Sequence, residues 1–311
     1  MFLASLLLCA LLLSGCELFW PEAPLGSIKA IFVGLNYQGT DVNTLGGTIH
    51  DATEMEMCFS ELSVRHEREY HSYSLLQTGT FIPETASYAF DGYSSSLPTR
   101  ENLFSLIEVL KPTIAEQDLT IFSYSGHGYD DGSLVLATEN GKIFAEDETI
   151  REEALVSVTE LLAAFSSLPG KKLLIFDSCY SGAFVGESGS SVNLIERDTY
   201  LDKAFETFFS SDSYAPSLFV LTATTKDNTS KEPGGIHSHG YFTKALLEGL
   251  GWDDDAMTLG DGSPAKEKGV LTTDSLFSYI LGHQNFPLRG INTKRYQHPT
   301  ISGGPYALVL F

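Results

Sequence analysis

Basic residues are scarce in this sequence. Lysine and arginine together number 19, against 40 aspartate and glutamate residues, so the formal net charge is −21 at pH 7. A nucleic-acid-binding surface needs Lys and Arg to neutralise phosphates, and no basic patch is present to supply them. We therefore expect no nucleic-acid partner. The acidic surface is compatible with attracting basic substrates, and solubility explains it equally well.

Cysteine is also rare, at four residues. The chain shows no disulfide framework, no CxxC pair and no histidine cluster with zinc spacing. His237 and His239 lie two apart in a polar stretch, which is weak evidence for a metal site. Cys58 falls in a helical pattern beside Met55 and Phe59, so we expect it in the core. We assign no metal ligand from these residues.

A long apolar run is missing except at the N-terminus. Residues 1–15 are almost wholly apolar, but they are short for a membrane span and end in LSGC at residues 13–16. This resembles a bacterial lipoprotein signal, although no Lys or Arg precedes the run. The resemblance implies cleavage before Cys16, a lipid on its thiol, and a protein anchored in the bacterial cell envelope on the periplasmic or cell-surface side. A cleaved ordinary signal and a buried N-terminal helix are the alternatives.

The remainder is rich enough in hydrophobic residues, 43% of the chain, to bury a sizeable core. Residues 16–27 are expected to be a tether, and residues 28–311 one domain. Apolar runs typical of strands alternate with amphipathic stretches typical of helices, which predicts an α/β fold with a mostly parallel sheet covered on both faces. Strands are expected near residues 27–37, 70–76, 119–124, 133–138, 171–176, 217–222 and 306–311, and helices near 46–63, 99–115, 157–168, 241–251 and 273–281.

Two of these strands end in chemically useful residues. Residues 173–176 lead into Asp177-Ser178-Cys179, and residues 119–124 lead into SGHG at residues 125–128. Carboxyl ends of parallel strands lie at one edge of a sheet, and the 52 residues between His127 and Cys179 leave room for a crossover. Alone, the cysteine would be a buried small hydrophobe and the histidine a turn residue. Together they predict a cysteine–histidine dyad.

The motifs SGHG at residues 125–128 and DSCYSG at residues 177–182 resemble the catalytic motifs of caspase-like cysteine peptidases, and metacaspases more than animal caspases. Residues 29–40, 45–55 and 239–250 add to the resemblance, which covers roughly residues 28–251. It implies a caspase-like three-layer sandwich with a mostly parallel central sheet. It also implies a cysteine endopeptidase that cleaves peptides or proteins after Arg or Lys.

The resemblance also assigns a substrate pocket. Asp51, Ser125 and Asp177 match residues that form the acidic pocket for a basic P1 side chain in metacaspases. A buried guanidinium needs carboxylate partners, so the physical argument agrees. Two alternatives stay open: Asp51 as an exposed helix residue, and Asp177 as a cap for the backbone turn beneath Cys179. Backbone N–H groups of Gly128 and Cys179 are suitable oxyanion donors.

The sequence departs from the family at several positions. Thr48, His50 and Tyr180 stand where metacaspases have a pocket Cys, an Asn and often a His, and Gly186 and Glu187 replace an aspartate of the calcium site. No cofactor is required by the dyad, and calcium remains an open expectation. Its candidate ligands are clustered carboxylates that include Asp130, Asp131, Glu146 and Asp147.

Two further hypotheses compete with an active peptidase. One is a catalytically silent caspase-like module used for binding on a membrane-anchored lipoprotein, and the other is a thiol-dependent acyl transferase. If the peptidase is active, we expect self-cleavage within residues 186–216, which are Gly- and Ser-rich at their start. Arg197 and Lys203 are the two basic residues there, and Arg197 is favoured because residues 200–209 have helical character. An uncut surface loop is the alternative.

Overall fold

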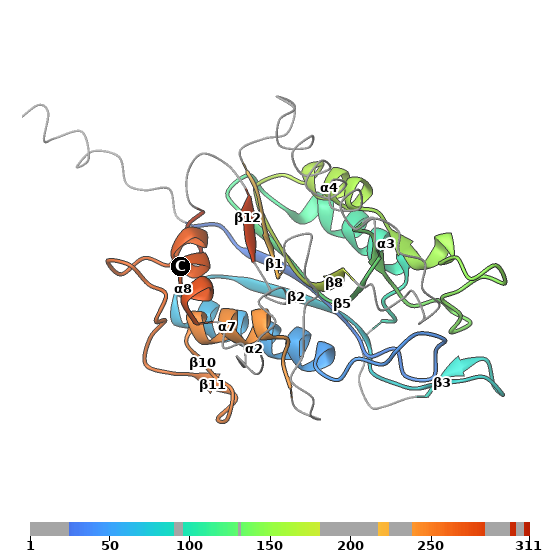
Figure 1. Ribbon diagram of the computed structural model, residues 1–311. Helices are drawn as coiled ribbons and strands as arrows, with labels where there is room; N and C mark the ends of the chain where they lie inside the picture. Colours follow the sequence, from blue (N-terminus) through green and yellow to red (C-terminus); the bar gives the residue numbers. More distant parts are fainter. Residues whose placement is uncertain are drawn as a thin grey trace, which may run out of the picture.

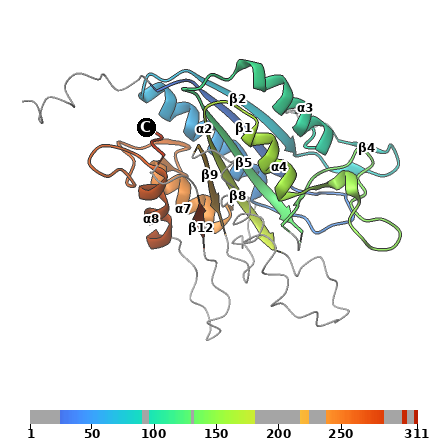
Figure 2. The same cartoon turned by 90° about the horizontal axis from the view of Figure 1, so that it is seen from above.

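The structure is a computed structural model that describes residues 25–89, 96–129, 132–180, 217–223, 238–283, 299–302 and 308–311. Its centre is a sheet whose main path runs in the order β12-β9-β8-β5-β1-β2 (Figures 1 and 2). The bounds are β1 Ile28–Leu35, β2 Tyr70–Gln77, β5 Leu119–Gly128, β8 Lys171–Tyr180, β9 Leu218–Thr222 and β12 Thr300–Ser302. Neighbours from β2 to β9 are parallel, and β12 pairs antiparallel with β9.

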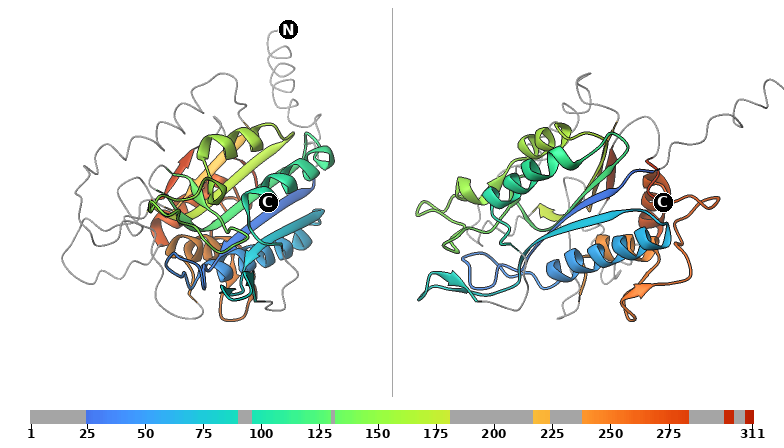
Figure 3. Two further views of the ribbon diagram at one scale, coloured as in Figure 1. Left: turned by 90° about the vertical axis from the view of Figure 1, so that its right-hand side faces the viewer. Right: turned by 180° about the vertical axis from the view of Figure 1, so that it is seen from behind.

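Helices cover both faces of this sheet (Figures 1 and 3). One face carries α2 (Thr48–Arg65), α7 (Tyr241–Leu250) and α8 (Thr273–His283), and the other carries α3 (Arg100–Leu110) and α4 (Val158–Ser166). The three layers and the mostly parallel sheet confirm the fold class expected from the sequence. Short elements decorate them: η1 Lys111–Thr113, η2 Glu152–Ala154, β6 Leu134–Val135, β7 Leu155–Val156, β3 Phe81–Ile82, β4 Ser87–Tyr88, β10 Trp252–Asp253 and β11 Thr258–Leu259.

Strand β1 is apolar except for Lys29, and its burial explains this composition. All eight of its residues are buried, because successive side chains enter opposite cores. Phe32 belongs to the core beneath α2, α7 and α8, whereas Ile31 and Val33 belong to the core beneath α3 and α4. Cys58 is fully buried in the first of these cores, as the sequence predicts.

Local signals fix the starts of α3 and α4 close to where the sequence predicts them, although α3 ends at Leu110 and not near residue 115. The Thr99 hydroxyl accepts a hydrogen bond from the Asn102 N–H at the start of α3. Ser157 and Glu160 form a reciprocal capping box at the start of α4. Gly170, with a φ of +70°, turns the chain from α4 into β8.

The expectation of a strand at residues 306–311 is wrong. The edge strand is β12, and residues 308–311 instead lie beside the start of α8, where Val309 forms one isolated bridge with Thr272. The continuous apolar sequence there reflects burial, since Leu308, Leu310 and Phe311 belong to the core beneath α2, α7 and α8. Ser87 and Tyr88 form β4 and pair with β3, and residues 90–95 are outside the described part.

The N-terminal segment with its lipoprotein-like signal, including Cys16, lies outside the described residues. Among the residues that are described, no helix is both long and apolar enough to cross a membrane.

Candidate active site

The candidate residues lie where the strand order of the sheet reverses, next to β1. The chain leaves β1 through α2 to β2 on one side, while β5 lies on the other side of β1. Ligands of open α/β sheets bind at such a switch point, beyond the carboxyl ends of the strands. The site residues come from three segments there: Asp51 in the first turn of α2, Ser125, His127 and Gly128 at the end of β5, and Asp177 and Cys179 at the end of β8.

His127 and Cys179 are direct register partners on the neighbouring strands β5 and β8. The side chain of Cys179 is outside the described part of the structure, so its position is fixed here by the backbone alone. His127 is buried, and its Nε2 lies 2.7 Å from the backbone oxygen of Asn43. A carbonyl oxygen only accepts, so Nε2 carries the proton and Nδ1 is the basic nitrogen. Burial lowers the pKa of His127, which favours the neutral imidazole.

Two tyrosines hold this histidine, and sequence reasoning missed both. The His127 N–H donates to the Tyr37 hydroxyl over 2.9 Å, and the Tyr124 hydroxyl lies 2.6 Å from the His127 carbonyl oxygen. The Tyr37 ring also packs on the imidazole, with ring centroids 4.6 Å apart. Tyr37 has a φ of +56°, a backbone conformation that is rare and strained for an aromatic residue. Such strain is typical of functional positions.

Asp51 is buried, with a relative exposure of 2%, so the alternative of an exposed helix residue is wrong. Its Oδ2 accepts a hydrogen bond of 2.6 Å from the Ser125 hydroxyl. Its Oδ1 lies 2.9 Å from Nδ1 of His239 and 3.2 Å from the Gly240 nitrogen. Burial raises the pKa of Asp51 to about 7, and the nearby charge of Asp177 acts in the same direction.

Asp177 is bound by the first turn of α7. Its Oδ2 accepts hydrogen bonds from the Thr243 backbone N–H at 3.2 Å and the Thr243 hydroxyl at 2.7 Å. The described hydrogen bonds of Asp177 thus lead to a helix N-terminus, where the helix dipole favours a carboxylate. Because Gly240 of the same turn donates to Asp51, the N-terminus of α7 holds both carboxylates of the expected pocket. The structure therefore brings Asp51, Ser125 and Asp177 together.

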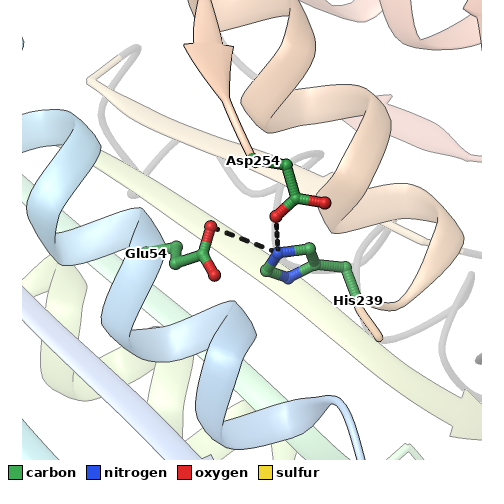
Figure 4. A group of neighbouring side chains, drawn as sticks. All are labelled: Glu54, His239 and Asp254. Atoms are coloured by element: carbon green, nitrogen blue, oxygen red, sulfur yellow. Dashed lines mark hydrogen bonds and ion pairs between the residues drawn. The ribbon is translucent and has the colours of Figure 1, made fainter. Parts of the chain in front are cut away.

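His239 is the residue that sequence reasoning placed wrongly. It was expected in a polar loop, yet its relative exposure is 2%. Its Nε2 lies 2.9 Å from Oδ1 of Asp254 and 3.3 Å from Oε2 of Glu54 (Figure 4). Burial acts to lower the pKa of His239, but hydrogen bonds with Asp51 and Glu54 outweigh it and raise the pKa to about 10. The imidazole is therefore surrounded by three carboxylates beside the expected pocket.

A faint sequence signal pointed to this cluster. Glu54 follows Asp51 by three residues, so the two carboxylates lie on the same face of a helix. The partners His239 and Asp254 stand 188 and 200 positions after Asp51 and Glu54 respectively, since 239 − 51 = 188 and 254 − 54 = 200. Nothing in the local sequence joins these segments.

Of the expected calcium ligands, Glu146 and Asp147 are described and Asp130 and Asp131 are not, so the calcium expectation stays a prediction. The Asp147 carboxylate accepts hydrogen bonds from the backbone and hydroxyl of Thr149 in an exposed turn. Within the part of the chain that the structure describes, the one set of three potential metal ligands is Glu54, His239 and Asp254. The expectations that concern Asp130, Asp131, Gly186, Glu187, Arg197, Lys203 and His237 all lie outside the described residues.

Comparison with known proteins identifies the family and several relatives. A family profile described as the caspase domain matches residues 27–261. Metacaspase-5 of Trypanosoma brucei brucei is 22% identical over 269 residues, which cover 81% of this chain and 51% of that protein. Metacaspase-1 of Kluyveromyces lactis is 27% identical over 161 residues, which cover 50% and 34%. The chain spans about half, or less, of the length of these curated relatives.

A solved structure also aligns with most of the chain. The crystal structure of protein GSU0716 from Geobacter sulfurreducens superposes with a TM-score of 0.47 and 15% sequence identity, covering 89% of this chain and 93% of that one. The family profile spans β1 through β11 and includes both strands that carry the candidate dyad. On that match, the chain belongs to the caspase-domain family of cysteine peptidases.

Proposed function

We infer that this protein is a cysteine endopeptidase with a Cys179–His127 dyad that cleaves peptides or proteins after Arg or Lys. The observation that carries the proposal is the register of β5 and β8, which makes His127 and Cys179 neighbours at the carboxyl edge of the sheet. The buried carboxylates Asp51 and Asp177 beside them support the basic specificity.

The chain's own residues supply each step of the proposed reaction. His127 Nδ1 takes the thiol proton of Cys179, and the sulfur attacks the carbonyl carbon of the scissile peptide. Backbone N–H groups of Gly128 and Cys179 stabilise the resulting oxyanion. The imidazolium then protonates the leaving amine, and an acyl-enzyme remains. Water hydrolyses the thioester with His127 again acting as the base.

The pocket is proposed to recognise the substrate through charge. A P1 guanidinium or ammonium group is bound by Asp51 and Asp177, and the Ser125 hydroxyl orients the Asp51 carboxylate. Removing one carboxylate leaves a buried cation less compensated, which costs several kcal/mol in this kind of environment. The basic preference should therefore be more sensitive to these residues than the fold is.

The test uses the full chain and peptides that differ only at P1. Wild type is expected to cleave after Arg and Lys, Cys179→Ala to be inactive, and His127→Ala to lose roughly 10²–10⁴-fold in kcat. His71→Ala is the matched control, because His71 is an exposed histidine paired with Glu69 far from the site. A Cys179→Ala protein that cleaves at the wild-type rate would overturn the proposal.

The specificity is tested separately by Asp51→Asn, with Asp261→Asn as an exposed control. Asp51→Asn should raise KM or lower kcat/KM for Arg and Lys peptides, while Asp261→Asn should leave both unchanged. An unchanged preference in Asp51→Asn and in Asp177→Asn would remove the pocket assignment.

Labelling of Cys179 by a thiol-reactive Arg peptide separates an active peptidase from a silent binding module. Ester turnover without peptide cleavage would instead favour an acyl transferase.

Three further parts of the proposal concern regions outside the described residues. Lipid anchoring at Cys16 predicts that Cys16→Ala releases the protein from the membrane fraction of a bacterial cell. Calcium dependence is tested by assaying with and without a chelator. Self-cleavage predicts two fragments split after Arg197 in wild type and none in Cys179→Ala, and an intact, fully active wild type would refute it.

A further inference from the structure

Three donor groups converge on one point beside the expected substrate pocket. They are Nε2 of His239, a carboxylate oxygen of Glu54 and one of Asp254, and all lie within 4.8 Å of one another. Figure 4 shows Glu54 reaching from α2 and Asp254 from the chain after β10, with both carboxylates directed at the same ring nitrogen. Glu54 and His239 are buried, and Asp254 has 38% of its side chain exposed.

One hydrogen on Nε2 of His239 cannot make good hydrogen bonds with both carboxylates. Nε2 carries at most one hydrogen, yet it faces Asp254 at 2.9 Å and Glu54 at 3.3 Å. One N–H makes one well-aligned hydrogen bond, so the second carboxylate has no well-aligned donor on this ring nitrogen. A divalent cation placed among the three groups interacts with both carboxylates and with the ring nitrogen at once. The composition of the cluster thus favours a metal ion over a proton.

The spacing of the donors also suits a small metal ion. Ligand distances of ~2.0–2.1 Å at tetrahedral angles separate the donor atoms by ~3.3–3.4 Å. The Nε2 to Glu54 distance is 3.3 Å, and the Nε2 to Asp254 distance of 2.9 Å is a few tenths of an ångström short. Because Asp254 lies on the exposed side, it is the ligand that has room to move. The cluster therefore needs only a small opening to bind an ion.

Neighbouring groups orient two of the three ligands. The other ring nitrogen of His239, Nδ1, is hydrogen-bonded to the Asp51 carboxylate at 2.9 Å. The indole N–H of Trp252 donates to Oε2 of Glu54 over 2.7 Å. Metal-binding histidines commonly have this form, with one nitrogen on the metal and the other held by a carboxylate. The ligand set is thus preorganised and tied to the pocket through Asp51.

We propose that Glu54, His239 and Asp254 form a binding site for one divalent transition-metal ion of the Zn²⁺ class. One imidazole and two carboxylates suit Zn²⁺ or Co²⁺, whereas Ca²⁺ prefers six to eight oxygen ligands. The exposed side of Asp254 gives the ion an entry path and leaves a coordination position for solvent. This site is separate from the dyad and does not depend on peptidase activity.

The experiment measures metal binding by the untagged full chain in a Cys179→Ala background, which removes a competing thiol. Zn²⁺ stoichiometry is determined by elemental analysis after gel filtration, and Co²⁺ is followed by its visible absorption. We expect one equivalent bound at this site, and excess Ca²⁺ should not displace the Co²⁺. Displacement of Co²⁺ by an equal amount of Ca²⁺ would overturn the assigned metal class.

Asp254→Asn decides the ligand assignment, because this side chain is partly exposed and its replacement is compatible with the fold. It should weaken Co²⁺ binding at least tenfold, with Glu54→Gln as the second ligand variant and circular dichroism as the check on folding. His71→Ala is the matched control, since His71 and Glu69 form an exposed histidine–carboxylate pair without a third ligand. Absence of stoichiometric metal in the parent, or parent-like affinity in Asp254→Asn, would refute the site.

Discussion

Replacing Gly240 with alanine should destabilise the protein through a single steric contact. Gly240 precedes α7 with a φ of −55° and a ψ of 142°, which any residue adopts, so backbone strain plays no part. An added Cβ would lie 2.2 Å from Oδ2 of Asp177 and 2.8 Å from its Cγ. The buried carboxylate has to move, and it then leaves the backbone N–H and hydroxyl of Thr243.

The magnitude follows from those two hydrogen bonds. Each hydrogen bond to a charged group is worth about 1.5–3 kcal/mol, so losing both costs about 3–6 kcal/mol. Relaxation of α7 away from the sheet reduces that loss, and we expect the free energy of unfolding to fall by about 3 kcal/mol. The fall is a large part of the 5–15 kcal/mol that stabilises a typical domain.

Urea unfolding of the full chain, followed by circular dichroism, measures the effect. Gly282→Ala is the control: Gly282 lies in α8 with nothing within 4 Å of the added Cβ, so alanine should stabilise by up to about 1 kcal/mol. In an Asp177→Ala background, Gly240→Ala should cost much less, because the clashing carboxylate is gone. A Gly240→Ala protein within about 0.5 kcal/mol of wild type would show that this contact does not matter.

Three other changes test the structure at separate points. Thr99→Ala should lower the unfolding free energy by about 1 kcal/mol, because the Asn102 N–H loses its cap, and an unchanged urea midpoint would contradict this. Burial raises the pKa of the Cys58 thiol, so a water-soluble maleimide should label Cys58 only after unfolding, as read by mass spectrometry; labelling of native protein would be contrary evidence. Burial lowers the pKa of His127 below its usual 6.5, so the unfolded chain takes up this proton first as the pH falls. The stability difference between wild type and His127→Gln should therefore shift against wild type below about pH 6.5, and a difference independent of pH would refute this.

The sheet was predictable because its strands are buried on both faces. Short runs rich in apolar residues, such as LTIFSY before the histidine, are typical of strands that are covered on both faces. The adjacency of His127 and Cys179 in the sheet was predictable for a related reason, since parallel strands deliver their carboxyl ends to one edge. Helices starting near Thr99 and Ser157 were predictable because amphipathic patterns begin there. All of these signals are local.

The environment of the pocket was not predictable, because it depends on contacts between distant segments. His239 follows a polar stretch and looks like a surface residue, yet it is buried between α2 and the chain after β10. Asp177 was expected to be a pocket residue, but its partner Thr243 belongs to a helix and lies 66 residues away in the sequence. The strand expected at residues 306–311 was wrong for a different reason. A short continuous apolar run indicates burial, but it does not show that the segment joins the central sheet, and residues 308–311 instead bond to the chain at Leu271 and Thr273.

The pairing of β5 with β8 makes the site sensitive to chain length. Ser125 faces Asp177 and His127 faces Cys179 as register partners, and each pair is two residues from the other. Side chains alternate between faces of a sheet, so inserting one residue earlier in either strand would put neighbours such as Tyr124 or Phe176, which belong to the opposite core, in the places of these polar groups. A change in the length of either strand would therefore disrupt the site and could not simply alter its specificity. Substitution at fixed positions, or change in the loops beyond the strand ends, is the route that remains.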